Sequence, residues 1–277
     1  AGVMVGLLLF DSTFEPIGLP LTILMAVLII VAFTEMLKLL KTRGVAVLWL
    51  SGAIGAVLLA TCPFWWRYLA DYISLGSPTP DGLQIFLLIS FVLMAIFLEQ
   101  MFQNSPETSL LRIAGTALAT FYLGLGGAMI LTIRIAYGPS MIVMFLACVK
   151  LTDVGAYFTG SLIGKHKLIP KLSPKKTWEG LIGGLVTASI AAMLLPLLLQ
   201  QIFPGSAPYW PWWQAALFGA ILGLVGQFGD LCESLLKRSA HVKDSGAMVP
   251  EFGGVLDIVD SLLFSAPVAI VLLSFME

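Results

Sequence analysis

Three aspartates stand in or beside strongly apolar segments near the carboxyl end of the chain. Asp230 lies in GQFGDLCES, and Asp257 and Asp260 lie in GGVLDIVDS. Asp257 and Asp260 are three residues apart, so on a helix they share one face. A charge at mid-bilayer costs about 2.5–3.5 kcal/mol on insertion scales, and a bound cation would offset this cost. Carboxylate oxygens favour Mg²⁺ over Zn²⁺. The three acids therefore predict a magnesium-type site. The alternative is that they form ion pairs with Lys237, Arg238 or Lys243 at the membrane interface.

A lysine-rich segment, KHKLIPKLSPKKTWEG at residues 165–180, could bind phosphates. It places five lysines beside a Ser-Pro turn and just before an apolar stretch. The first turn of a helix there would add unpaired N–H groups and the positive end of the helix dipole. The alternative is a topogenic loop that also contacts anionic lipid head groups. A second basic stretch follows at 237–243.

Other polar residues in apolar surroundings have less specific roles. Lys150 and Asp153 are three residues apart, and we expect an intramembrane pair or a polar cavity there. The small residues in GAYFTG after Asp153 leave room for a ligand. Glu35, near the end of its apolar segment, is expected to be interfacial or solvated, as are His166 and His241.

The composition indicates that most of this surface does not face water. Of 277 residues, 58% are hydrophobic and 11% charged, and the mean hydropathy is +0.97. The net charge of −1 offers no general attraction for nucleic acid. Three separated cysteines suggest neither a disulfide framework nor a zinc site.

The elements that must position these residues are membrane spans. A bilayer core of about 30 Å needs roughly 20 apolar residues per helix. We predict an all-α, polytopic transmembrane bundle of about nine helices, the first of them short enough to be truncated. The predicted spans are 1–10 (partial), 17–37, 45–62, 82–101, 110–133, 139–164, 178–203, 212–236 and 255–275.

The distribution of charge predicts the orientation of the bundle. Alternating spans place segments 38–44, 102–112, 165–177 and 237–254 on one side, with twelve of the fifteen Lys and Arg residues. The positive-inside rule makes this side cytoplasmic. We treat the chain as a single transmembrane domain, 1–277, in which 1–137 are mainly scaffold helices and 138–277 the catalytic half.

At this point two segments resemble a known family, the phosphatidate cytidylyltransferases, also called CDP-diacylglycerol synthases. Residues 229–261, GDLCESLLKRSAHVKDSGAMVPEFGGVLDIVDS, are similar to the family signature. DVGAYFTGSLIGKHKLIPKLSPKKTWEG is similar to a segment upstream of that signature. The chain departs from the family at Phe252, where His is usual, and at Ile258, where Arg is frequent.

The resemblance implies a reaction for phospholipid biosynthesis, in which CTP and phosphatidate give CDP-diacylglycerol and pyrophosphate. It implies that Asp230, Asp257 and Asp260 bind Mg²⁺, with room for a second cation. The implied substrate-binding residues are Asp153, Ser173, Lys175, Lys176, Thr177, Glu179 and Ser234. The implied catalytic residues are Lys237, Arg238, Lys243 and Asp244.

The expected partners are CTP, phosphatidate and the bilayer, without nucleic acid, and a homodimer is left open. The expected location is a bacterial-type inner membrane, with a multi-pass chain and a site that faces the cytoplasm. Two alternatives stay open. One is a cation- or proton-coupled secondary transporter, because intramembrane acids also suit ion coupling. The other is a cytidylyltransferase for a different lipid phosphate.

Overall fold

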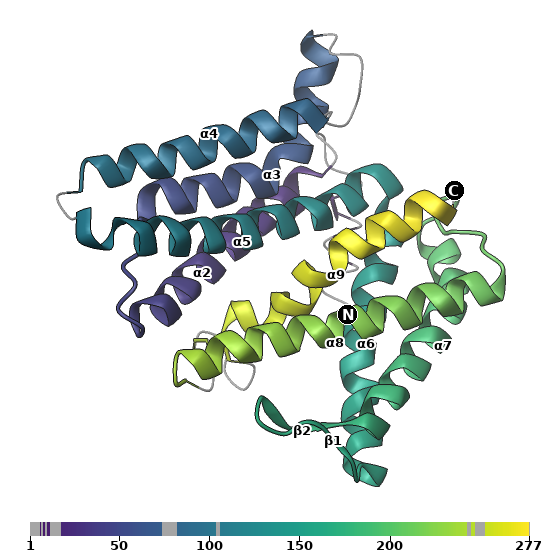
Figure 1. Cartoon of the computed structure of the whole chain (residues 1–277). Helices are drawn as coiled ribbons and strands as arrows, with labels where there is room; N and C mark the ends of the chain where they lie inside the picture. The colour runs from purple at the N-terminus through teal and green to yellow at the C-terminus, as the bar shows by residue number, and fades with distance from the viewer. Residues whose placement is uncertain are drawn as a thin grey trace. The chain divides into compact units, whose positions relative to one another are not determined.

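The chain folds as long helices joined by short connections (Figure 1). The computed structural model describes residues 6, 8, 10, 11, 18–73, 82–103, 106–242, 245–246 and 253–276. Its long helices are α2 (Leu19–Lys41), α3 (Trp49–Ile73), α4 (Gly82–Met101), α5 (Ser109–Tyr137), α6 (Pro139–Ile163), α7 (Trp178–Ile202), α8 (Trp212–Ser239) and α9 (Val255–Met276).

All eight of these helices are long and apolar enough to cross a membrane. This confirms the predicted all-α, multi-pass architecture. The largest difference in bounds is at α3, which continues to Ile73 beyond the predicted end at residue 62. The extension contains Trp65 and Trp66. The predicted end was too early because hydropathy marks only the part of a helix that suits lipid, whereas the helix itself can continue through the interface. Most of the partial span predicted at 1–10 lies outside the described residues.

Two compact units divide the chain. The hairpin unit comprises Ala136–Arg238 and Ile258–Glu277, and the N-terminal unit comprises Gly2–Ile135 and Ser239–Asp257. The signature segment, residues 229–261, is therefore shared between the two units. Helix α9 has its first turn in the N-terminal unit and the rest of its length in the hairpin unit.

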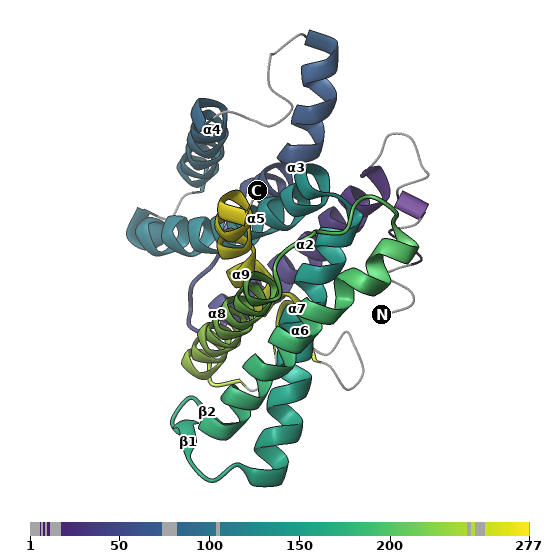
Figure 2. The same ribbon diagram turned by 90° about the vertical axis from the view of Figure 1, so that its right-hand side faces the viewer.

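The hairpin unit is built around the close contact of α6 with α7 (Figures 1 and 2). A Cβ atom on Gly183 would overlap the side chain of Thr159, and one on Gly155 would overlap that of Thr187. Each helix thus offers a glycine where the other places a threonine. Small residues of this kind let helix backbones approach closely in lipid, where no hydrophobic effect drives helices together.

A two-stranded antiparallel hairpin, β1 (Lys167–Ile169) and β2 (Ser173–Thr177), connects α6 to α7. Lys167 pairs with Thr177, and Ile169 pairs with Ser173. We expected a loop here, because strands of three and five residues rich in lysine give no periodic apolar pattern. The segment instead forms a β-hairpin, whose backbone pairing fixes the direction of the β2 side chains.

In the N-terminal unit, α3 packs against both α2 and α4. Leu48, Leu59, Val92 and Ile96 form a buried apolar cluster there. Glu99 on α4 accepts a hydrogen bond of 2.6 Å from the backbone N–H of Ser51, in the first turn of α3. A carboxylate thus satisfies an amide that the helix itself leaves unpaired.

Candidate functional site

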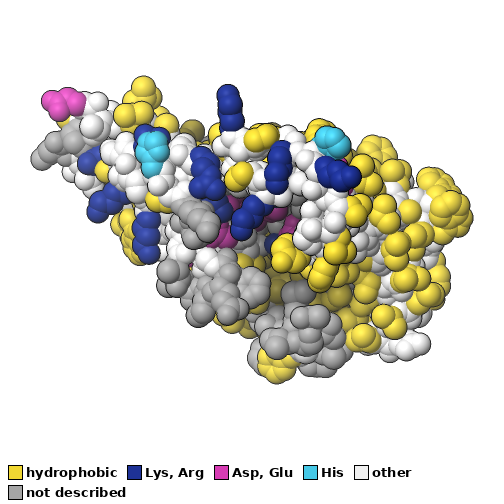
Figure 3. Space-filling view, turned by 90° about the horizontal axis from the view of Figure 1, so that it is seen from below, with side chains coloured by type: hydrophobic (Ala, Val, Ile, Leu, Met, Phe, Trp, Pro, Cys, Tyr) yellow, Lys and Arg dark blue, Asp and Glu magenta, His cyan; other side chains and the backbone are white. Residues whose placement is uncertain are grey.

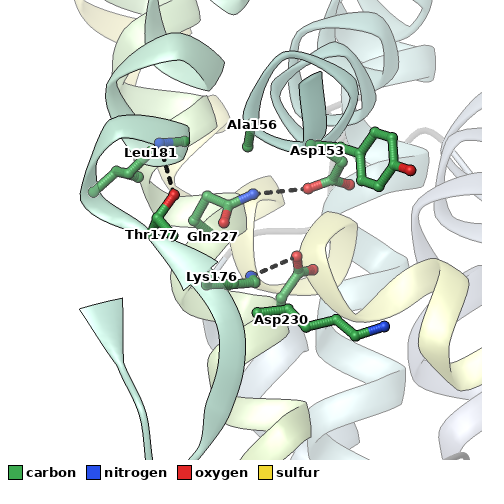
Figure 4. Close-up of a pocket in the computed structure, with 10 residues that line it drawn as sticks. Asp153, Ala156, Lys176, Thr177, Leu181, Gln227 and Asp230 are labelled. Atoms are coloured by element: carbon green, nitrogen blue, oxygen red, sulfur yellow. Dashed lines mark hydrogen bonds and ion pairs between the residues drawn. The ribbon is translucent and has the colours of Figure 1, made fainter. Parts of the chain in front are cut away.

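A cavity of about 220 Å³ opens in the hairpin unit (Figure 4). It is lined by Asp153, Ala156, Tyr157, Lys175, Lys176, Thr177, Gly180, Leu181, Gln227 and Asp230. Five of these were predicted as site residues from the sequence: Asp153, Lys175, Lys176, Thr177 and Asp230. The cavity is smaller than the roughly 300–1,000 Å³ of pockets that enclose drug-sized ligands. In this conformation it matches a phosphate group better than a whole nucleotide.

Opposite charges meet across this cavity. The Nζ atom of Lys176 lies 2.9 Å from Oδ2 of Asp230, and both side chains are about 23% exposed. On the facing helix, Oδ1 of Asp153 accepts a hydrogen bond of 2.9 Å from the Gln227 amide (Figure 4). Oδ2 of Asp153 lies 3.8 Å from Nζ of Lys150, which confirms the predicted pair. The carboxyl groups of Asp153 and Asp230 also interact with each other, so two like charges share this small space.

Local structure explains why these side chains converge. Gln227 and Asp230 are three residues apart on α8, and therefore lie on one face of that helix. Alternation along β2 leaves Lys175 exposed, whereas Lys176 turns to the half-buried face and reaches Asp230. The lysine pair in the sequence therefore supplies one cation within the site and a second at its rim.

Helix α7 begins at the wall of the cavity. Thr177 is its N-cap, and its hydroxyl oxygen accepts a hydrogen bond of 3.1 Å from the N–H of Gly180. Glu179 does not enter the cavity lining. Its carboxylate accepts hydrogen bonds from both the ring Nδ1, at 2.6 Å, and the backbone N–H of His166. Glu179 therefore connects the start of the hairpin to the first turn of α7. The contact with His166 was not predicted from the sequence.

A further predicted acid of the hairpin unit, Asp260, is 2% exposed. Its Oδ1 accepts a 2.6 Å hydrogen bond from the backbone N–H of Ser261, and its charge interacts with that of Asp230. Lys150 donates to the Ser261 hydroxyl at 2.8 Å. Asp230 thus interacts with both of the other predicted acids of this unit, Asp153 and Asp260.

Asp257 belongs to the N-terminal unit and has different surroundings. Its Oδ2 accepts hydrogen bonds from the backbone N–H of Gly254, at 2.7 Å, and from the N–H and hydroxyl of Ser245, at 3.2 and 2.9 Å. The bond from Gly254 is the reciprocal bond of a capping box, in which the third residue of a helix reaches back to the N-cap. Among the residues that the structure describes, no three His, Cys, Asp or Glu side chains are gathered as a metal site.

The remaining predicted residues lie at the edge of this arrangement. Lys237 is 2.5 Å from Oε2 of Glu233 one turn earlier on α8, and Glu233 is buried. Arg238 is exposed and donates to the carbonyl oxygen of Leu172 in the hairpin turn, at 3.5 Å. Ser173 and Ser234 are half-buried and do not line the cavity. Lys243, Asp244 and Phe252 lie outside the described residues.

Sequence reasoning missed two functional candidates. Gln227 carried a usable signal, because an amide three residues before Asp230 in an apolar helix shares its face. Glu35 was expected to be interfacial or solvated, and it is not solvated, because the residue is only 1% exposed. It accepts hydrogen bonds from backbone amides more than two hundred residues away, at Val255 and Leu256.

On the face of the molecule in Figure 3, lysine and arginine side chains surround a hollow in which acidic side chains are visible. Exposed lysines of the hairpin, Lys167, Lys171 and Lys175, contribute to the basic charge of the hairpin unit. Recessed carboxylates beneath exposed ammonium groups suit a ligand that carries both phosphates and a cation.

Comparison with known proteins gives a consistent result. The chain matches the model of the cytidylyltransferase family over residues 1–276. It is 35% identical to a phosphatidate cytidylyltransferase of Bacillus subtilis over 251 residues, which are 90% of this chain and 87% of that protein. Phosphatidate cytidylyltransferases of Staphylococcus aureus and Staphylococcus epidermidis are 33% and 30% identical, over 92% and 98% of this chain and 90% and 96% of theirs.

Proposed function

The chain belongs to the cytidylyltransferase family, and on this basis we propose that it is a CTP:phosphatidate cytidylyltransferase of phospholipid biosynthesis. The observation that carries the proposal is the near full-length similarity to enzymes of that name in three bacteria. It is a nucleotidyltransferase embedded in a membrane. The same similarity does not favour a secondary transporter.

In the proposed reaction a phosphate oxygen of phosphatidate attacks the α-phosphorus of CTP. The bond between the α- and β-phosphates breaks, and pyrophosphate leaves with its electron pair. No protein nucleophile is required, so the protein contributes position and electrostatic stabilisation. Lys176 and Lys175 are suited to phosphate oxygens, and the first turn of α7 adds N–H groups of positive character behind Thr177.

The ion pair of Lys176 with Asp230 also bears on catalysis. Asp230 holds Nζ of Lys176 at 2.9 Å, so the ammonium group is oriented before substrate arrives. Preorganised charge avoids reorganisation during the reaction. Glu233 holds Lys237 in the same way on α8. Lys237, Arg238 and Lys243 are assigned to the lipid phosphate or the leaving pyrophosphate. Asp244 is assigned to orienting a basic neighbour or holding the nucleotide.

Magnesium is part of the proposal. Asp230 interacts with the like charges of Asp153 and Asp260, and the hard oxygen donors of these carboxylates suit a divalent cation. Asp230 and Asp260 would hold the ion, with Asp257 as the further ligand that the family resemblance implies. When bound, such an ion supplies positive charge against the developing charge on phosphoryl oxygens.

The site is assigned to the cytoplasmic side of a bacterial-type inner membrane. The predicted alternation of spans gives the side that contains the hairpin twelve of the fifteen basic residues, which supports this orientation by the positive-inside rule. A soluble nucleotide and a lipid head group can meet at such an interface.

Purified protein in detergent with phosphatidate, CTP and Mg²⁺ tests the proposal. We expect pyrophosphate release and formation of CDP-diacylglycerol, both dependent on the lipid and on Mg²⁺. Matched reactions with ATP, GTP or UTP, and with other lipid phosphates, define the substrate class. The proposal would be contradicted if folded wild-type protein did not turn over phosphatidate. Cation flux in proteoliposomes without CTP would also contradict it.

A further inference from the structure

Glu35 is a buried carboxylate in an otherwise apolar part of α2. It is 1% exposed, and its neighbours along the helix, such as Phe33 and Met36, are buried apolar side chains. An acid in such a place is costly unless hydrogen bonds compensate its charge. Its partners therefore indicate why the residue is there.

Those partners are the first backbone amides of α9. Oε1 of Glu35 accepts a hydrogen bond of 3.1 Å from the N–H of Val255, and Oε2 accepts one of 2.8 Å from the N–H of Leu256. Both amides belong to the first turn, where a helix provides no acceptor of its own. The positive end of the α9 dipole further favours a carboxylate at this position.

The surrounding backbone leaves space for this one side chain. A Cβ atom on Gly254 would lie 2.5 Å from Oε2 of Glu35, and a Cβ atom on Gly246 would overlap its Oε1. These two glycines flank the carboxylate from different parts of the signature segment. The glycines thus allow the backbone of that segment to close around the acid of α2.

Glu35 and Asp257 are connected through Ser245. The Ser245 hydroxyl lies 2.9 Å from Oδ2 of Asp257 and 3.4 Å from Oε2 of Glu35. Asp257 in turn accepts from Gly254, the residue just before the two amides that Glu35 holds. Two carboxylates and one serine therefore fix three consecutive backbone amides and the orientation of the Asp257 side chain.

We infer that Glu35 is a positioning residue for the reaction: it holds the first turn of α9 and, through Ser245, the Asp257 carboxylate. This inference rests on the proposed function, because it gives the N-terminal unit a part in the chemistry. Removing Glu35 would leave the Val255 and Leu256 amides unpaired and would loosen the orientation of Asp257. Removing the groups that orient a metal ligand typically lowers metal affinity or activity by about 10–100-fold.

The test compares Glu35→Gln with Glu99→Gln in the full-length protein. Glu99 is a matched control, since it is also a carboxylate that accepts from the first turn of a helix in the same unit, at Ser51. Glutamine keeps the shape but offers one carbonyl oxygen for the two amides. For Glu35→Gln we expect kcat to fall about tenfold and the Mg²⁺ concentration at half-maximal rate to rise about tenfold. Glu99→Gln should change neither, and Glu35→Asp should recover part of the loss.

Amide hydrogen exchange provides a readout that does not depend on turnover. We expect peptides covering residues 253–260 to exchange faster in Glu35→Gln than in the wild type or in Glu99→Gln. If the wild type turns over and the two glutamine variants match in Mg²⁺ dependence and in exchange, the inference is wrong while the proposed function stands. If the wild type does not turn over CTP with phosphatidate, the proposed function fails, and the exchange comparison still decides whether Glu35 holds the turn.

Discussion

The hairpin unit and the N-terminal unit both contain carboxylates in apolar helices, but they compensate those charges differently. In the hairpin unit, Asp153 and Asp230 line a cavity and face lysine or amide side chains. In the N-terminal unit, Glu35 and Asp257 accept hydrogen bonds from backbone amides at the start of α9. The first arrangement lines a cavity, whereas in the second backbone amides hold both carboxylates in place.

This difference separates two uses of acids in a membrane protein. Backbone amides at a helix start are fixed in place, so carboxylates bound to them become part of the framework. Side-chain partners such as Lys176 can exchange one anion for another, so carboxylates paired with them can take part in binding. We therefore expect substitutions in the cavity to affect turnover most, and substitutions at the α9 turn to affect stability as well.

The largest effect is expected for Asp230→Asn. The change keeps the shape but removes the charge that orients Lys176 and, in the proposed site, binds Mg²⁺. Loss of one preorganised electrostatic group lowers kcat by about 10²–10³-fold in other enzymes, and we expect a fall of this size in pyrophosphate release. Glu107→Gln, an exposed acid in a short turn, is the control. Retention of full activity by Asp230→Asn would remove the cavity from the mechanism.

A smaller effect is expected for Lys176→Met, which removes the cation and keeps most of the side-chain length. A hydrogen bond to a charged group is worth about 1.5–3 kcal/mol, so kcat/KM should fall by about 10–100-fold. Lys167→Met, on the exposed strand of the same hairpin, makes the same change of charge and should stay near the wild type. Equal losses in both variants would indicate a general effect of hairpin charge.

For the α9 turn, Ser245→Ala should lower both stability and turnover, because the Ser245 hydroxyl connects Glu35 to Asp257. It removes a hydroxyl donor from Asp257 while the backbone N–H of Ser245 remains as a partner. We expect a loss of about 1.5 kcal/mol or less, because the backbone N–H groups of Ser245 and Gly254 still donate to Asp257. The loss should be seen as a lower midpoint of thermal unfolding. Ser274→Ala, whose exposed hydroxyl bonds within its own helix, is the control. Unchanged turnover in Ser245→Ala would mean that this hydroxyl does not orient Asp257 for the reaction.

The smallest effect is expected for Thr177→Ala, which removes the uncharged hydroxyl that caps the start of α7. The N-cap hydroxyl is worth about 1 kcal/mol of stability. Thr177→Ser keeps the hydroxyl that accepts from Gly180 and should retain most of the unfolding midpoint. If Thr177→Ser loses as much stability as Thr177→Ala, packing of the methyl group and not the cap stabilises this helix start.

Much of this architecture was predictable because lipid imposes simple rules on a chain. Span lengths follow from the thickness of the bilayer, and the predicted starts of α4, α6, α7, α8 and α9 coincide with the described ones. Lys175 and Lys176 were found because a local cluster of charge is visible in the sequence. Asp153 and Asp230 were found because acids are rare in apolar helices.

The partners of these residues were harder to predict. That Asp230 pairs with Lys176 depends on how α8 meets the hairpin, and that contact leaves no periodic pattern. Glu35 was misjudged because its position near a helix end suggested solvent, whereas its acceptor role depends on amides 220 residues further along the chain. The three acids of the predicted metal site stay a prediction, since Asp257 belongs to a different unit from Asp230 and Asp260.

The long separation between Glu35 and its amides bears on the order of biogenesis. Helix α2 leaves the ribosome before α9 does, and Val255 is synthesised 220 residues after Glu35. An acid in lipid without partners costs about 2.5–3.5 kcal/mol, so the nascent chain carries this penalty until α9 is inserted. When α9 forms, its first backbone amides bind Glu35 and compensate its charge. A chain truncated before α9 is therefore recognisable as incomplete by its uncompensated acid.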